Sequence, residues 1–192
     1  MTDPVLHVLA GPNGAGKSSL YAHLVEPTTH LPFVNADVLA AARWPGDELA
    51  RAYDASRLAA DERTRLLEAR RSFVTETVFS HESKLQLLRD AIAAGYLVTL
   101  HVVLVPVELS VVRVRVRHEQ GGHDVPEDKI RARHERLWPL VVEAIAIVQA
   151  AEVYDNSRAA TPFRRLASFR DGRPLDGVEW PSWTPPALTD AF

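Results

Sequence analysis

The sequence contains no cysteine among its 192 residues. This absence excludes disulfide bridges, zinc–thiolate sites and cysteine nucleophiles. No apolar run approaches the ~20 residues that span a bilayer. The first residues, MTDPVLHVLAG, carry neither the basic region nor the long apolar stretch of a signal peptide. We therefore expect a soluble, cytoplasmic protein with no membrane partner.

The sequence also lacks an excess of positive charge. It has 22 basic and 25 acidic residues, a net charge of −3, whereas nucleic-acid binders usually carry a basic excess. Hydrophobic residues make up 46% and charged residues 24%, the balance of an ordinary globular chain that forms one domain. We expect no nucleic-acid partner, although a local group of arginines would suffice for a small anionic substrate.

Strand and helix patterns alternate along the chain, which predicts βαβ units around a parallel sheet. The expected strands are 5–10, 33–37, 72–79, 96–105 and 152–157, and the expected helices are 17–24, 47–71, 82–95 and 127–151. The stretch VVRVRVRH (111–118) alternates with the period of a strand, but it also places Arg113 and Arg117 on one helical face. We predict a helix there, because a parallel sheet needs a crossover before its next strand.

The stretch GPNGAGKSS follows the first strand and opens the first helix, and it matches G-x-x-x-x-G-K-[ST]. Glycines let the backbone curl so that its N–H groups surround a polyphosphate. Lys17 would reach the β- and γ-phosphates of ATP, and the Ser18 hydroxyl would bind Mg²⁺. The alternative is a helix cap with an incidental lysine. The predicted nucleotide-binding residues are Gly11, Pro12, Asn13, Gly14, Ala15, Gly16, Lys17, Ser18 and Ser19.

Two acidic residues lie near the ends of strands, at the edge of the sheet where ligands of parallel sheets bind. Asp37 follows FVNA, and we predict that it accepts the proton of an attacking hydroxyl. It could instead cap a helix that begins at Val38. Glu76 lies within FVTETVFSH and could bind a substrate hydroxyl or a magnesium water. Its alternative is a buried carboxylate paired with an arginine.

The stretch RHEQGGHDVPEDKIRARHER (117–136) allows three interpretations. A zinc site is disfavoured because His118, His123, Asp124 and His134 fit no common ligand spacing. A nucleic-acid surface is disfavoured because acidic residues interrupt the arginines, which is typical of solvated ion pairs.

The favoured interpretation of this stretch is a lid. Gly121 and Gly122 supply a hinge, and Pro126 begins the next helix. Arg117 and Arg133 then lie on the two flanking helices, from which both could reach a γ-phosphate.

Five stretches together resemble the zeta-toxin-like kinases: GPNGAGKSS, NADVLA, TETVFSHESKL, RHEQGGHDVPEDKIRARHER and VYDNS, in that order, over about residues 5–157. The resemblance implies ATP-dependent phosphorylation of an amino-sugar hydroxyl in UDP-N-acetylglucosamine. It also implies an antitoxin as a candidate partner, although the sequence lacks the N-terminal extension that would meet one in the usual way. The roles it implies are the P-loop lysine, the general base, the acidic substrate-binding residue and two phosphate-neutralising arginines: Lys17, Asp37, Glu76, Arg117 and Arg133.

We therefore predict an α/β P-loop NTPase fold, resembling a nucleotide kinase, with a parallel sheet of about five strands flanked by helices. Residues 1–175 would form a single kinase domain with an arginine-bearing lid near 113–136, and residues 176–192 an extended tail. The predicted partner is a small-molecule phosphate acceptor. The alternatives are a sugar or antibiotic phosphotransferase of other specificity, and a nucleotide-binding module that acts through a partner protein.

Overall fold

The structure is a computed structural model that describes residues 3–120 and 125–192. Its strands are β1 (Val5–Ala10), β2 (Phe33–Val34), β3 (Phe73–Thr77), β4 (Leu97–Leu104), β5 (Ala150–Asp155), β6 (Arg164–Arg170) and β7 (Arg173–Pro174). Its helices are α1 (Lys17–Leu20), the π-helical η1 (Tyr21–Val25), α2 (Glu26–Thr29), α3 (Ala36–Arg43), α4 (Ala52–Glu68), α5 (Ser83–Ala93), α6 (Val107–Glu119), α7 (Glu127–Ile147) and α8 (Pro186–Thr189). Among the residues described, no helix is long and apolar enough to cross a membrane.

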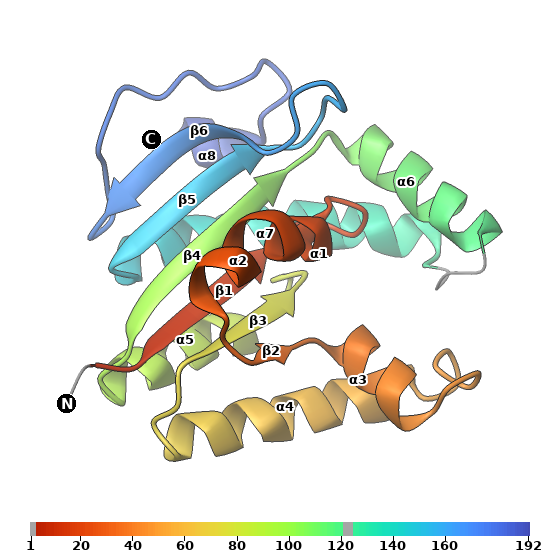
Figure 1. The fold of residues 1–192 in the computed structure, drawn as a ribbon. Coiled ribbons are helices and arrows are strands. Elements are labelled where there is room, and N and C mark those ends of the chain that lie inside the picture. The colour runs from red at the N-terminus through yellow and green to blue at the C-terminus, as the bar shows by residue number, and fades with distance from the viewer. Residues whose placement is uncertain (1–2, 121–124) are drawn as a thin grey trace.

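The strands form one sheet in the order β2-β3-β1-β4-β5-β6-β7 (Figure 1). The first five strands of this order run parallel, with β1 between β3 and β4. The carboxyl ends of β1, β2 and β3 therefore meet at one edge. The expected α/β class with a parallel sheet and flanking helices is confirmed, and so is the helix predicted over 111–118, which lies within α6.

The five parallel strands match the predicted number, but β6 and β7, which were not predicted, extend the sheet in the antiparallel direction. In β6 only Ala167 and Phe169 are buried, and the remaining positions are arginine, serine or half-buried leucine. A strand with so few buried positions carries a weak apolar alternation, so no strand was predicted over these residues.

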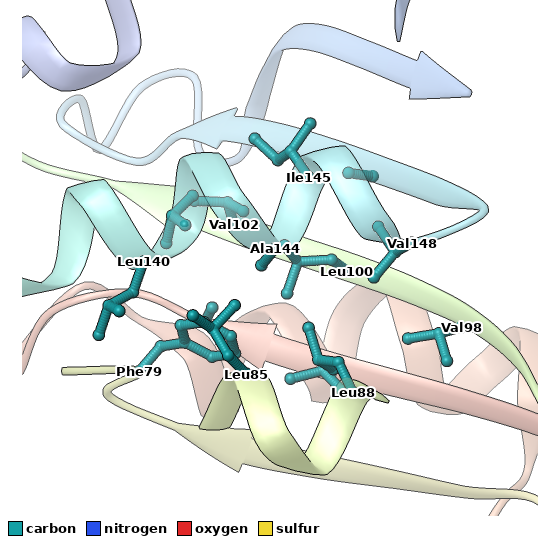
Figure 2. Close-up of a cluster of buried hydrophobic side chains, with 14 of the residues drawn as sticks. Phe79, Leu85, Leu88, Val98, Leu100, Val102, Leu140, Ala144, Ile145 and Val148 are labelled. Carbon is teal, nitrogen blue, oxygen red and sulfur yellow. The ribbon is translucent and has the colours of Figure 1, made fainter. Parts of the chain in front are cut away.

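Alternating side chains of the strands pack on the two faces of the sheet. On one face, apolar residues of α4, α5, α7 and α8 form the larger core cluster with Leu6, Val8 and Ala10 of β1. Figure 2 shows Leu85 and Leu88 of α5 in this cluster, beside side chains of β4 and α7. On the opposite face, residues of α1 and η1 form a smaller cluster. Burial of each leucine of this kind stabilises the fold by about 1.5–3 kcal/mol.

Residues 176–192 differ from the extended tail that we predicted. They contain α8, whose Leu188 is fully buried in the larger core cluster. The C-terminal Phe192 ring lies 4.6 Å from the Phe169 ring of β6. Trp180 and Trp183 also pack against the larger core cluster, so this segment covers part of the core.

A pair of histidines, of which His101 is buried, joins β1 and β4 at the centre of the sheet. Nε2 of His101 on β4 lies 3.0 Å from Nδ1 of His7 on β1, and His101 is 9% exposed. Burial, together with the nearby His7, lowers the pKa of His101 from 6.5 to about 3. The folded protein therefore resists protonation of His101 at pH values at which the unfolded chain accepts it.

We expect the free energy of unfolding to fall as the pH decreases from 7 to 5, with about 2 kcal/mol of the loss due to His101. The sign follows because the unfolded histidine binds a proton near pH 6.5, whereas the folded one binds it only near pH 3. Urea unfolding at the two pH values should show a smaller loss in His101→Leu. The exposed His30→Asn is the matched control and should behave as the wild type. An unchanged pH dependence in His101→Leu would contradict the assignment.

Candidate active site

The loop between β1 and α1 is shaped by close backbone packing. Gly11, Gly14 and Gly16 all have positive φ angles, of 152°, 70° and 91°. A Cβ atom at Gly11 would lie 2.6 Å from the Val103 carbonyl oxygen, and one at Gly16 would lie 2.5 Å from Nδ2 of Asn156. The loop therefore requires glycine at these positions, as a backbone cradle for phosphates does.

Lys17 is folded back onto this loop. Its ammonium group donates a hydrogen bond of 3.0 Å to the Pro12 carbonyl oxygen and lies 3.8 Å from Oε1 of Glu76, and its side chain is 6% exposed. Burial lowers the pKa of Lys17, and the Glu76 carboxylate opposes that shift. The positive charge of Arg117 lowers this pKa further, which indicates that Arg117 lies near the Lys17 ammonium group.

Glu76 at the end of β3 holds three neighbouring groups together. One of its carboxylate oxygens accepts hydrogen bonds from the Ser18 hydroxyl, at 2.7 Å, and from Nδ2 of Asn35, at 2.8 Å. The other carboxylate oxygen faces Lys17. The alternative of an arginine-paired strand carboxylate is therefore wrong within the part of the chain described. Glu76 positions the serine that we predicted as the metal ligand.

Asp37 lies in the first turn of α3 and does not cap it. Oδ1 of Asn35 accepts hydrogen bonds from the backbone N–H groups of Asp37, at 2.7 Å, and Val38, at 3.2 Å. The capping alternative for Asp37 is therefore wrong, because its neighbour performs that task. The Asp37 side chain is exposed to a cavity and available for chemistry.

One cavity of about 620 Å³ brings the predicted catalytic and substrate residues together. Its lining includes Lys17, Ser18, Asp37, Glu76, Arg117 and Arg133. Asn13, Gly14, Gly16 and Ser19 of the predicted nucleotide-binding loop also line it. Gly11, Pro12 and Ala15 do not line the cavity; they are buried behind the loop and shape its backbone.

The two arginines reach the cavity from neighbouring helices. Arg117 lies near the end of α6 and Arg133 in the second turn of α7. Three buried residues of these helices, Val111, Val114 and Ile130, form one cluster with Val125, which precedes α7. On the outside of this pair of helices, the Arg131 guanidinium lies 2.6 Å from a carboxylate oxygen of Glu108 and 2.8 Å from one of Glu127. The residues predicted as a hinge, Gly121 and Gly122, lie outside the described residues together with His123 and Asp124.

His134 on α7 is a packing residue in this structure. Its Nδ1 accepts a hydrogen bond of 3.2 Å from the Trp138 indole, and its Nε2 lies 3.4 Å from the Val105 carbonyl oxygen. Burial lowers the pKa of His134. Both ring nitrogens of His134 therefore have partners within the packing around α7.

Sequence reasoning missed several residues that support the loop. Asn35 was overlooked beside Asp37, although a polar residue just before a helix is a capping pattern. Arg113 lines the cavity, and its guanidinium lies 3.4 Å from the Gly14 carbonyl oxygen. The Ser110 hydroxyl donates a hydrogen bond to the Asn13 carbonyl oxygen. Asn35 and Asn156 each had a signal, because they lie in the stretches NADVLA and VYDNS.

We expect Asn156→Leu to weaken both the fold and nucleotide binding. Nδ2 of this buried residue donates a 2.8 Å hydrogen bond to the Ala15 carbonyl oxygen, which the substitution would leave without this donor. The cost is about 1–3 kcal/mol of unfolding free energy. Urea unfolding and ATP titration would measure the two effects. The exposed Thr161→Ala, in the same β5–β6 connection, should change stability by less than about 0.5 kcal/mol, and equal effects of the two substitutions would contradict the prediction.

These features define a kinase-like P-loop NTPase domain. They are the parallel sheet, the glycine-rich loop after β1, and the lysine and serine that follow this loop. The family described as an AAA domain (AAA_33) matches residues 6–140, and the chain belongs to this family. No significant match is found among curated proteins.

Solved structures share this fold. The chain is 16% identical to a chain of the PezAT chromosomal toxin-antitoxin system of Streptococcus pneumoniae, covering 86% of this chain and 72% of the other, with a TM-score of 0.63. It is 19% identical to a chain of the AvrRxo1-ORF1:-ORF2 structure with ATP, with a TM-score of 0.71. The chain spans 92% of its own length but 61% of that chain. At these identities the likeness shows a common fold.

Proposed function

We propose that the protein is a Mg²⁺-ATP-dependent kinase that transfers the γ-phosphate to a hydroxyl of a small metabolite. The observation that carries the proposal is the convergence of Lys17, Ser18, Asp37, Arg117 and Arg133 on one cavity. A phosphate cradle, an exposed carboxylate and two cations are the groups that phosphoryl transfer to an alcohol requires.

In the proposed step, the Asp37 carboxylate accepts the proton of the acceptor hydroxyl. The acceptor oxygen forms a bond to the γ-phosphorus as the bond from that phosphorus to the bridging oxygen breaks, and ADP leaves with the electron pair. Lys17 and the loop N–H groups hold the phosphates. Arg117 and Arg133 stabilise the negative charge on the transferring group.

The residues around Ser18 fit a magnesium ion. The Ser18 hydroxyl and the Glu76 carboxylate provide adjacent oxygens, and oxygen atoms are the ligands that Mg²⁺ prefers. Ser18 would bind the ion, and Glu76 would accept hydrogen bonds from its waters. When bound, the ion neutralises charge on the phosphate oxygens.

The leading acceptor class is a nucleotide sugar such as UDP-N-acetylglucosamine, on the resemblance to zeta-toxin-like kinases. A sugar or antibiotic acceptor of another kind is the second candidate. PezAT is a toxin-antitoxin system and AvrRxo1-ORF1 is in complex with ORF2. An antitoxin partner and a cytoplasmic location remain predictions for this chain.

The test is ADP release measured with and without a panel of hydroxyl compounds, with mass spectrometry of the products. A product that gains one phosphate, together with acceptor-dependent ADP release, would support the kinase. ADP release that is the same with every acceptor and with none would favour a nucleotide-binding module instead.

A further inference from the structure

Two basic side chains from outside the P-loop and the α6–α7 pair also line the cavity. Arg63 lies on α4, and Lys84 lies in the first turn of α5. On α4, the residues that line the cavity are Ser56, Ala59 and Arg63, at i, i+3 and i+7. This spacing places the three residues on one face of the helix. The face of α4 that lines the cavity therefore runs from Ser56 to Arg63.

The charges of Arg63 and Lys84 are not balanced by acidic neighbours. Throughout residues 3–120 and 125–192, neither side chain forms an ion pair or a side-chain hydrogen bond, although exposed arginines such as Arg51, Arg65 and Arg131 do. Both side chains are half-buried. Burial lowers the pKa of each, and the charge of Arg63 lowers that of Lys84 further.

Two like charges held near each other and partly removed from water destabilise the protein unless an anion joins them. The helix that carries Arg63 packs against α3, which carries Asp37. Lys84 follows the β3–α5 connection, whose residues Thr77–His81 also line the cavity. The pair therefore belongs to the part of the cavity wall that α4 and α5 form, separate from the loop that would hold ATP.

We propose that Arg63 and Lys84 bind an oxyanion of the acceptor, so that the acceptor class is a hydroxyl compound that also carries a phosphate, diphosphate or carboxylate group. This inference rests on the proposed function. The flat guanidinium of Arg63 can donate two parallel hydrogen bonds to two oxygens, and Lys84 adds a second charge. The acceptor hydroxyl would then lie at Asp37 while its anionic group is held at a distance from the transferring phosphate.

The experiment compares N-acetylglucosamine, N-acetylglucosamine 1-phosphate, UDP-N-acetylglucosamine and glucuronate as acceptors. The wild type should prefer charged acceptors, and the preferred one distinguishes a phosphate from a carboxylate. In Arg63→Ala with Lys84→Met, KM for that acceptor should rise about 10- to 100-fold, because charge-assisted hydrogen bonds are lost. The KM for ATP should stay unchanged, and Arg63→Lys should restore part of the affinity.

The matched control removes two charges from exposed positions that do not line the cavity, with Arg65→Ala and Lys129→Met. It should leave both KM values unchanged. Acceptor-dependent transfer without any preference for charge, or a preference that survives the double substitution, would overturn the inference while leaving the kinase proposal intact.

If no acceptor is phosphorylated, the result counts against the kinase proposal. A second measurement then tests the oxyanion site by binding alone. Calorimetric titration of the ADP-loaded protein would compare UDP-N-acetylglucosamine and glucuronate with neutral N-acetylglucosamine. Tighter binding of a charged compound, lost in the double variant, would support the oxyanion site. Equal or undetectable binding in the wild type and the variant would overturn it.

Discussion

Asp37→Asn is expected to abolish acceptor-dependent ADP release, with a loss of about 10²–10⁴-fold in kcat, the usual contribution of a general base. The substitution keeps the shape of the side chain and removes its ability to accept a proton. Asp37 is exposed to the cavity, and α3 is capped by Asn35 instead. Folding and ATP binding should therefore be nearly unchanged, which calorimetry and thermal unfolding can verify.

The matched control for this prediction is Asp61→Asn, on the exposed surface of α4 outside the cavity. It removes the same charge and should retain wild-type turnover. If Asp37→Asn also retained wild-type acceptor-dependent turnover, Asp37 would not be the base. Acceptor-independent turnover that is the same in the wild type and in Asp37→Asn would favour the nucleotide-binding module.

The second large effect is expected from Arg117→Ala and Arg133→Ala, each of which should lower kcat by about 10³-fold or more, as for arginines that stabilise phosphoryl transfer elsewhere. The affinity for ATP should change little, because we expect the P-loop and Lys17 to hold most of the phosphate oxygens. Arg117 is close enough to lower the pKa of Lys17, which places its charge near the phosphate cradle. Single-turnover kinetics would separate the chemical step from binding.

Arg115→Ala provides the matched control for the two arginines. Arg115 lies on the same helix as Arg117, and its guanidinium lies 3.6 Å from Glu127 in an exposed ion pair. Such a surface pair contributes about 0–1 kcal/mol of stability, and its loss should leave kcat unchanged. Wild-type turnover in both Arg117→Ala and Arg133→Ala would remove these arginines from the mechanism.

The individual elements were largely predictable because their signals are local. The glycine-rich loop is recognised from nine consecutive residues, and its required glycines reflect backbone angles that few other residues adopt. The buried strand β4 is almost continuously apolar. The antiparallel strand β6 was missed because arginines and small residues conceal its two buried positions.

The candidate site was predictable residue by residue but not as an arrangement. Glu76 bonds to Ser18 across 58 positions of the chain and to Asn35 across 41, and no local pattern encodes either pairing. Asn35 was missed for this reason, since its capping role is local but its bond to Glu76 is not. The same holds for Arg63 and Lys84, which lie on two different helices and which only the fold places beside one cavity.

The sequence by itself determined the α/β class, the phosphate-binding loop and the residue types available for chemistry, because local backbone sterics and apolar periodicity carry that information. Only the tertiary structure decided which of the many acidic and basic side chains share one cavity. It also showed which charges are already paired at the surface, as Arg131 is, and which remain half-buried without an acidic partner among the described residues, as Arg63 and Lys84 do. The physical reason is that charge pairing and desolvation depend on distances between elements, and those distances are set by how the helices pack on the sheet.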